Sequence, residues 1–133
     1  MFLIYKLLTI IFVIFSPIFF LIRIFLGKED FKRFLEKYCI YNISYNDKET
    51  IWFHGASVGE ILSVIPLIKK IEENKNVKSI LLTSSTTSSA SIFKKIKLKK
   101  TKHIYFPIDE ENLTNKFIKF WKPKVAIFID SEI

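Results

Sequence analysis

The chain begins with a nearly unbroken run of apolar residues. The run covers 2–26 and is interrupted only by Lys6, Thr9, Ser16, Pro17 and Arg23. A helix needs roughly 20 apolar residues to cross a bilayer, and this run is long enough. It is also long for a secretory signal, and no small-residue cleavage site comes after it. The pattern predicts a transmembrane anchor over 1–26; a membrane-inserted hairpin and a helix lying in the membrane surface are the alternatives.

A shorter segment with apolar residues at helical spacing comes after the anchor. Phe31, Phe34, Leu35 and Tyr38 fit one face of a helix, so a short amphipathic helix is expected within 28–38. The polar stretch 42–49 then reads as a linker. The segment 27–49 is therefore predicted to join the anchor to a folded domain.

From residue 50 onward, short apolar runs alternate with segments of helical spacing. Strands are predicted at 50–54, 78–83, 103–106 and 124–129, and helices at 58–74, 87–96 and 109–120. Pro66, in the middle of the first helix, is a position where that helix could kink. Such alternation predicts right-handed crossovers and a parallel sheet with helices on both faces. The fold class is α/β, with a partial Rossmann-like domain over 50–133. The sequence stops directly after its fourth predicted strand, so we expect this domain to belong to a longer fold.

Charge and cysteine content bear on the compartment. The basic residues Arg23, Lys28, Lys32 and Arg33 close the apolar run, so the positive-inside rule places the remainder of the chain in the cytoplasm. The single cysteine, Cys39, agrees with a reducing compartment and is expected to be a packing residue. These features predict a protein held on the cytoplasmic face of the inner membrane.

The net charge of +8 arises mainly between Lys69 and Lys102, where ten lysines accompany only Glu72 and Glu73. These lysines are either solvated faces of a lysine-rich chain or a surface attracted to anionic lipids, with about 1 kcal/mol per lysine near the membrane. A nucleic acid partner is disfavoured, because no recognition motif is present and a predicted anchor precedes the domain.

Small residues join the first predicted strand to its helix, in the string His54-Gly55-Ala56-Ser57-Val58-Gly59-Glu60. The turn falls at the sheet edge where α/β proteins bind ligands. Ser57 and Glu60 have the spacing of a capping box, which would give them a purely structural role. Alternatively, Glu60 is a general base that the helix macrodipole keeps ionised, beside backbone N–H groups that hold an anion.

The same string fits G-x-S-x-G, the nucleophile elbow of serine hydrolases, with Ser57 as nucleophile. That fold requires an acid and then a histidine after the serine. His103 is the one histidine that comes after Ser57, and Asp109 and Asp130 both lie beyond it. The hydrolase interpretation is therefore disfavoured, and the lack of a following Gly-Lys-Ser/Thr excludes a Walker phosphate loop.

The string from His54 to Glu60 resembles the H-x-x-S-V-G-E signature of the Kdo (3-deoxy-D-manno-octulosonic acid) transferases. Further features match that family in the correct order. They are the apolar anchor with its basic flank, the Thr-rich loop 83–88, the Y-x-P-x-D box at 105–109, the Pro123-Lys124 strand and the triplet Asp130-Ser131-Glu132. Together they cover nearly the whole chain.

The resemblance implies the N-terminal half of a two-domain, GT-B type, inverting glycosyltransferase. The donor would be CMP-Kdo and the acceptor the lipid A precursor, lipid IVA, so that no metal or further cofactor is implied. Glu60 matches the family's catalytic base and Glu132 a supporting acid. The substrate-binding positions would be Ser57, Gly59, Ser84 and Thr86.

Two departures from the family pattern are Ser89, where a glycine is usual, and Asp130, where a glutamate is usual. The donor-binding C-terminal domain is absent from this sequence, so we expect the fragment to be inactive alone. The alternative is a non-enzymatic, membrane-tethered α/β binding module in which Glu60 only caps a helix.

Overall fold

The computed structural model describes residues 1–44 and 49–130. Its centre is a four-stranded parallel sheet in the order β3-β2-β1-β4. The strands are β1 (Thr50–Gly55), β2 (Ser79–Ser84), β3 (Thr101–Tyr105) and β4 (Pro123–Ile129). The predicted α/β fold with a parallel sheet is confirmed. The third strand starts earlier than predicted, so His103 lies inside β3 and not at its start.

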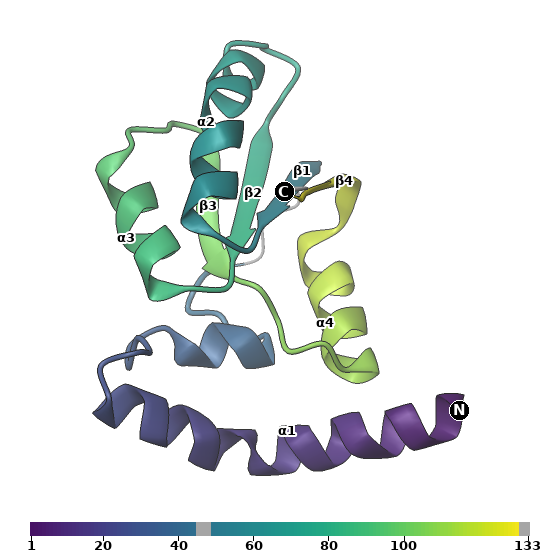
Figure 1. The fold of residues 1–133 in the computed structure, drawn as a ribbon. Helices are drawn as coiled ribbons and strands as arrows, with labels where there is room; N and C mark the ends of the chain where they lie inside the picture. The colour runs from purple at the N-terminus through teal and green to yellow at the C-terminus, as the bar shows by residue number, and fades with distance from the viewer. Residues whose placement is uncertain (45–48, 131–133) are drawn as a thin grey trace.

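Three helices cover the sheet: α2 (Val58–Glu72), α3 (Thr87–Lys95) and α4 (Glu111–Trp121). Figure 1 shows α2 and α3 on one side of the sheet and α4 on the other. Helix α2 continues through Pro66 as one helix. The alternation of strand and helix read from the sequence therefore gives the two-faced architecture that it predicted.

Each face of the sheet has its own core, because successive strand residues point to opposite sides. In β1, Phe53 faces α2 and Trp52 faces α4. Full burial of such side chains contributes about 1.5–3 kcal/mol each. The first core contains Phe53, Ile61, Val64, Ile65, Ile68, Ile80 and Leu82, and the second contains Cys39, Trp52, Leu81, Ile104, Phe117 and Trp121.

Cys39 is buried in the second core, where its Sγ donates to the carbonyl of Leu113 at 3.2 Å. The packing role predicted for it is confirmed. Strand β4 lies at one edge of the sheet and is less covered than the other strands, with Val125 49% and Phe128 57% exposed. Strands of a parallel sheet are normally buried on both faces, so β4 departs from that rule.

The N-terminal run forms one helix, α1 (Phe2–Phe25), which is long and apolar enough to cross a membrane by length and composition. Helix α1 lies along the carboxyl end of the sheet, beside the segment that contains residues 34–38 (Figure 1). The predicted amphipathic helix within 28–38 is wrong in most of its length. Only the 3-10 helix η1 (Phe34–Tyr38) forms there, and Phe31 and Leu35 are exposed.

The polar partners of this segment explain the difference. Asp30 Oδ1 accepts a hydrogen bond from the backbone N–H of Lys32, which closes a turn before a helix can start. The buried pair between Lys37 Nζ and Glu29 Oε1, at 2.8 Å, then fixes η1 by charge and not by an apolar stripe.

The lysines of the segment 69–102 lie toward the other end of the sheet. Helices return antiparallel to the strands, so the end of α2, the start of β2 and the α3–β3 connection gather at the amino ends of the strands. Helix α1 lies at the carboxyl ends (Figure 1). This placement favours the solvated-face explanation of the lysines over attraction to the membrane.

Candidate functional site

The turn between β1 and α2 forms a complete capping box. Ser57 Oγ accepts from the N–H of Glu60 at 3.3 Å. In return, Glu60 Oε2 accepts from the N–H of Ala56 at 2.6 Å and from that of Ser57 at 3.4 Å. The capping function predicted from the spacing is therefore confirmed, and it places a carboxylate at the N-terminus of α2, where the helix dipole stabilises a negative charge.

The two glycines of the turn serve different needs. A Cβ on Gly55 would lie 3.1 Å from Ile61 Cδ1 and 3.2 Å from Glu60 Cβ, so Gly55 lets the first turn of α2 approach the end of β1. A Cβ on Gly59 would meet nothing within 4 Å. Glycine costs a helix about 1 kcal/mol relative to alanine, so the packing of α2 does not explain Gly59.

A cluster of polar groups from β1 and β2 lies next to the turn. Thr83 Oγ1 accepts from Trp52 Nε1 at 2.9 Å and lies 2.9 Å from His54 Nδ1. The His54 ring also packs on Phe106, with 4.1 Å between centroids. Burial lowers the pKa of His54, and the opposing effects of Thr83 and Glu60 on this pKa are smaller. The lowered pKa favours the neutral ring. His54 is thus a satisfied strand-end histidine.

This arrangement does not support the hydrolase interpretation. In residues 1–44 and 49–130, the ring nitrogen of His54 is directed to Thr83 and those of His103 to Arg33 and Ser84. Ser57 Oγ is occupied instead as a helix cap. No histidine in the described part of the chain takes the position of a general base beside Ser57.

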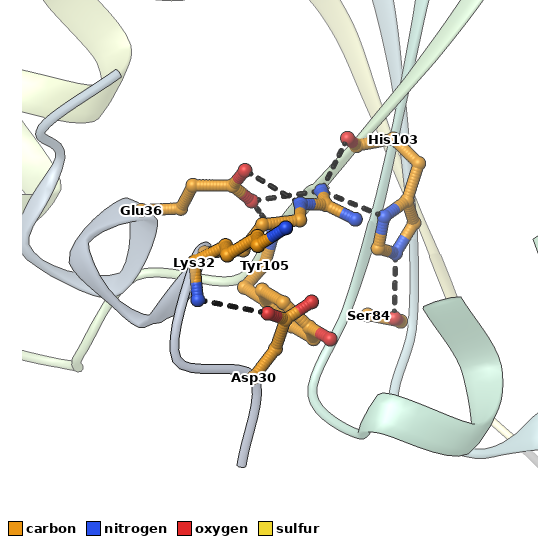
Figure 2. Close-up of polar contacts among 7 residues, drawn as sticks. Asp30, Lys32, Glu36, Ser84, His103 and Tyr105 are labelled. Atoms are coloured by element: carbon orange, nitrogen blue, oxygen red, sulfur yellow. Dashed lines mark hydrogen bonds and ion pairs between the residues drawn. The ribbon is translucent and has the colours of Figure 1, made fainter. Parts of the chain in front are cut away.

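Ser84, at the end of β2, is fully buried. Its Oγ lies 2.7 Å from His103 Nε2, and the two side chains point toward each other from neighbouring strands (Figure 2). Arg33 Nη2 lies 3.2 Å from the other ring nitrogen of His103 and donates to its carbonyl at 2.8 Å. Ser84 therefore belongs to a buried network behind the edge of the sheet.

Arg33 also binds Glu36, through Nε at 2.7 Å and Nη2 at 2.9 Å. Glu36 Oε2 in turn accepts from the backbone N–H of Tyr105 at 2.9 Å, at the carboxyl end of β3 (Figure 2). Bidentate arginine–carboxylate pairs of this kind are geometrically specific. The network fixes η1 against the sheet edge that carries the candidate site.

Thr86 is exposed and caps α3, with its Oγ1 accepting from the N–H of Ser89 at 3.2 Å. Ser89 is buried, and its hydroxyl lies 2.8 Å from that of Thr86. Among the described non-glycine residues, positive φ occurs only at Cys39 and Lys122. Ser89 therefore does not have the left-handed backbone conformation that would strain a serine where the family has glycine.

Of the predicted site residues, the structure brings two groups to one edge of the sheet. Ser57, Gly59 and Glu60 come after β1, while Ser84 and Thr86 close the neighbouring strand β2. Asp109, from the Y-x-P-x-D box, accepts from the Tyr5 hydroxyl at 3.1 Å and so faces α1. Glu132 lies outside the described residues, and its role stays a prediction.

Sequence reasoning missed Arg33, Glu36 and the contacts of His103. The i, i+3 spacing of Arg33 and Glu36 was a local signal for their pairing. Their partners on β3 lie about seventy residues later in the chain, as the Arg33–His103 bond shows, so no local pattern could have indicated them.

Comparison with known proteins identifies the family to which the chain is similar. A family model described as 3-deoxy-D-manno-octulosonic-acid transferase (kdotransferase) matches residues 32–133. No solved structure matches the chain.

Similar proteins occur in several organisms. A 3-deoxy-D-manno-octulosonic acid transferase of Rickettsia bellii is 38% identical over 120 residues, which cover 88% of this chain and 29% of the relative. The enzyme of Haemophilus influenzae is 30% identical over 103 residues, covering 77% and 24%. A probable 3-deoxy-D-manno-octulosonic acid transferase of Arabidopsis thaliana, named as mitochondrial, is 30% identical over 107 residues, which cover 80% of this chain and 24% of the relative.

The chain thus spans less than a third of the length of these relatives. The family match nevertheless covers β1 to β4 and the turn that carries Glu60. By this match the chain belongs to the 3-deoxy-D-manno-octulosonic acid (Kdo) transferase family.

Proposed function

We infer that this chain is the membrane-anchored, acceptor-side half of a Kdo transferase. The complete enzyme would transfer Kdo from CMP-Kdo to lipid IVA during lipopolysaccharide synthesis, on the cytoplasmic face of the inner membrane. Residues 1–26 would anchor it, 27–49 would link the anchor to the domain, and 50–133 would form the first of two GT-B domains. The second domain would bind most of the CMP-Kdo, so the chain alone would be inactive.

The observation that carries this proposal is the position of Glu60. Its carboxylate lies at the N-terminus of α2, at the carboxyl edge of a parallel sheet, and Ala56 N–H holds one of its oxygens at 2.6 Å. Ligands of open α/β sheets bind at this edge. A carboxylate fixed there is in place to accept a proton from a bound hydroxyl.

In the proposed reaction, Glu60 removes the proton from a glucosamine hydroxyl of the acceptor. The hydroxyl oxygen forms a bond to the anomeric carbon of Kdo, and the bond from that carbon to the CMP phosphate breaks on the opposite face. The proton stays on Glu60, and CMP leaves as an anion. Such displacement inverts the anomeric configuration, and the cap bond to Ala56 keeps the base oriented throughout.

Gly59 supports a ligand on this side of the turn. Its Cβ position opens onto free space, and a glycine in the first turn of a helix weakens that helix. A close approach of the acceptor to the backbone of α2 accounts for its use. Ser57 and Thr86 are exposed on the two neighbouring loops and complete the proposed contact surface, while buried Ser84 positions the second loop.

Replacement of Glu60 tests the proposal in the full-length enzyme. Glu60→Gln keeps a side-chain oxygen for the Ala56 N–H but cannot act as a base. We expect Kdo transfer to lipid IVA to fall by about 10²–10⁴-fold, the usual contribution of a general base. Glu110→Gln is the matched control, because it makes the same substitution in the carboxylate that caps α4, where it accepts from the N–H of Leu113 at 3.1 Å, and should change stability more than turnover.

The opposite pattern would give Glu60 only the structural role that it has in the binding-module alternative. The complete capping box is the observation behind that alternative, since it gives Glu60 a sufficient structural role. If Glu60→Gln retains full transfer and only lowers the melting temperature, Glu60 is a cap and the catalytic proposal is wrong.

A further inference from the structure

The polar residues of α1 all lie on one face of the helix. Lys6, Thr9, Ser16 and Arg23 are spaced by three and seven residues, which returns each to the same side of an α-helix. They coincide with the least exposed positions of α1. That face consists of Lys6, Thr9, Val13, Ser16, Phe20 and Arg23, and we call it the polar stripe.

The C-terminal half of the polar stripe packs on η1 and the turn before it. Ser16 Oγ lies 2.6 Å from the Tyr38 hydroxyl, and the Phe20 ring packs edge-on against Tyr38. Arg23 Nε binds the buried carboxylate of Glu29 at 3.2 Å. These contacts hold the end of α1 against the domain.

The N-terminal end of α1 contacts the domain as well. Lys6 Nζ forms an ion pair with Glu111 at 2.5 Å, and the Tyr5 hydroxyl donates to Asp109 at 3.1 Å. Glu111 begins α4 and Asp109 lies two residues before it, and Figure 1 shows α4 beside the N-terminal part of α1. The domain is therefore in contact with both ends of the helix.

A helix that crosses the bilayer cannot keep both sets of contacts. From Lys6 to Arg23 α1 rises about 26 Å at 1.5 Å per residue, close to the roughly 30 Å thickness of the hydrocarbon core. If α1 spanned the membrane, Lys6 would lie near the surface opposite Arg23. A water-soluble domain cannot reach both surfaces at once.

The face opposite the polar stripe is entirely apolar and uncovered. Its residues are Ile4, Leu7, Ile11, Ile18, Ile22 and Phe25, which are 43–90% exposed. Leu26 and Phe31, beyond the end of the helix, are exposed as well, and the exposed Lys28 and Lys32 lie among them in sequence. Apolar side chains flanked by lysines are typical of a helix bound at the boundary of headgroups and acyl chains.

We propose that α1 lies flat in the cytoplasmic leaflet, with its apolar face in the lipid and its polar stripe bound to the domain. The partner is a bilayer with anionic headgroups, which Lys28 and Lys32 contact. This mode of attachment would hold the carboxyl edge of the sheet at the membrane surface. The proposal does not depend on Glu60 being a base, and its tests do not measure activity.

Chemical cross-linking tests the contact at the N-terminal end. A carbodiimide joins a carboxylate to a neighbouring amine, so in inside-out membrane vesicles containing the chain it should link Glu111 to Lys6, as peptide mass spectrometry would show. Lys6→Arg keeps the charge but should abolish the product. The exposed pair Lys124–Glu49, at 3.2 Å, serves as the positive control, since it lies within the domain in either orientation.

Labelling of the N-terminus provides the second measurement. In the same vesicles, a cysteine introduced by Phe2→Cys should react with a membrane-impermeant maleimide, because a flat helix leaves it on the outer, cytoplasmic side. The unmodified chain, whose Cys39 is buried, gives the background. A protected position 2 together with no Lys6–Glu111 product would overturn the proposal and show that α1 spans the membrane.

A second copy of the chain is the competing occupant of the apolar face. Flotation with vesicles of phosphatidylethanolamine and phosphatidylglycerol distinguishes it from lipid. The proposal expects the chain to float with the vesicles, and Ile11→Asp with Ile18→Asp to reduce the floating fraction at least tenfold. A chain that stays unbound as a dimer, and becomes monomeric with the same two substitutions, would refute it.

Discussion

The guanidinium of Arg33 contacts His103 twice, at the ring Nδ1 (3.2 Å) and at the backbone carbonyl (2.8 Å). Arginine is only a donor, so Nδ1 must be the unprotonated nitrogen of a neutral ring. Nε2 then carries the hydrogen and donates it to Ser84 Oγ at 2.7 Å. The tautomer of His103 is therefore set by a residue that lies outside the sheet.

This neutral ring predicts a loss of stability in mild acid. Burial, with smaller effects from Arg33 and Lys94, lowers the pKa of His103 from 6.5 to about 3. The unfolded chain therefore binds the proton first, and stability present above pH 6.5 is lost as the pH falls toward 3. The slope is about 1.4 kcal/mol per pH unit, so roughly 2 kcal/mol disappears by pH 5.

Thermal unfolding in a non-ionic detergent at pH 7 and pH 5 measures that loss. His103→Gln can still donate to Ser84 and accept from Arg33 but does not titrate, so its loss over the same interval should be smaller by about 2 kcal/mol. Burial lowers the pKa of His54 as well, so part of the acid sensitivity will remain in the variant. Equal losses in both proteins would contradict the assignment to His103.

Gly55→Ala should disturb the turn that carries Glu60. The added Cβ would lie 3.1 Å from Ile61 Cδ1 and 3.2 Å from Glu60 Cβ, and each of these atoms would have to move by a few tenths of an ångström. Crowding of this kind costs about 1–3 kcal/mol. We expect a lower melting temperature, together with reduced Kdo transfer in the full-length enzyme. An unchanged melting temperature would show that the turn accommodates the methyl group without loss of stability.

Gly59→Ala should have the opposite effect on stability. The new Cβ meets no atom within 4 Å, and alanine favours the helix by up to about 1 kcal/mol over glycine. Kdo transfer should nevertheless fall, because the methyl group would enter the space proposed for the acceptor. A variant that is both more stable and fully active would remove the argument for an acceptor contact at this position.

Glu72 is expected to stabilise the connection before β3. Its carboxylate accepts from the N–H groups of Lys99 and Lys100 at 3.0 and 2.8 Å and from Thr101 Oγ1 at 2.7 Å. Burial acts to raise the pKa of Glu72, but these hydrogen bonds outweigh it and lower the pKa.

Glu72→Gln should therefore lower the free energy of unfolding by roughly 1 kcal/mol at pH 7, after allowance for solvent screening. Because the folded-state pKa is lowered, the difference should shrink as the pH falls below 4.5, the ordinary value. Glu73→Gln, at the exposed next position, is the matched control. A similar effect of both substitutions would indicate a general charge effect in this lysine-rich region.

Much of the fold was readable from local patterns. The strand and helix alternation from residue 50 onward predicted the parallel sheet, because each element carries its own periodicity. The capping box was equally local, since Ser57 and Glu60 are three residues apart. The Kdo transferase resemblance rested on the same turn, and the family match confirms it.

Features that depend on distant partners were not readable in this way. The apolar spacing of 28–38 predicted a helix, but Arg33 and Glu36 of that segment bind His103 and Tyr105, which lie about seventy residues later in the chain. In α1 the alignment of Lys6, Thr9, Ser16 and Arg23 was visible as spacing, yet it became informative only once η1 and α4 supplied its partners. The roles of Glu60 as base and Glu132 as supporting acid stay predictions.

The attachment of η1 to β3 has a mechanical consequence. Its directional bonds, from Arg33 to His103 and from Glu36 to Tyr105, cannot slide in small steps as an apolar contact can. The segment next to α1 and the rim of the sheet must therefore shift as one rigid unit. If α1 lies in the membrane as proposed, lateral pressure or curvature acting on it would reach the strand ends through these bonds.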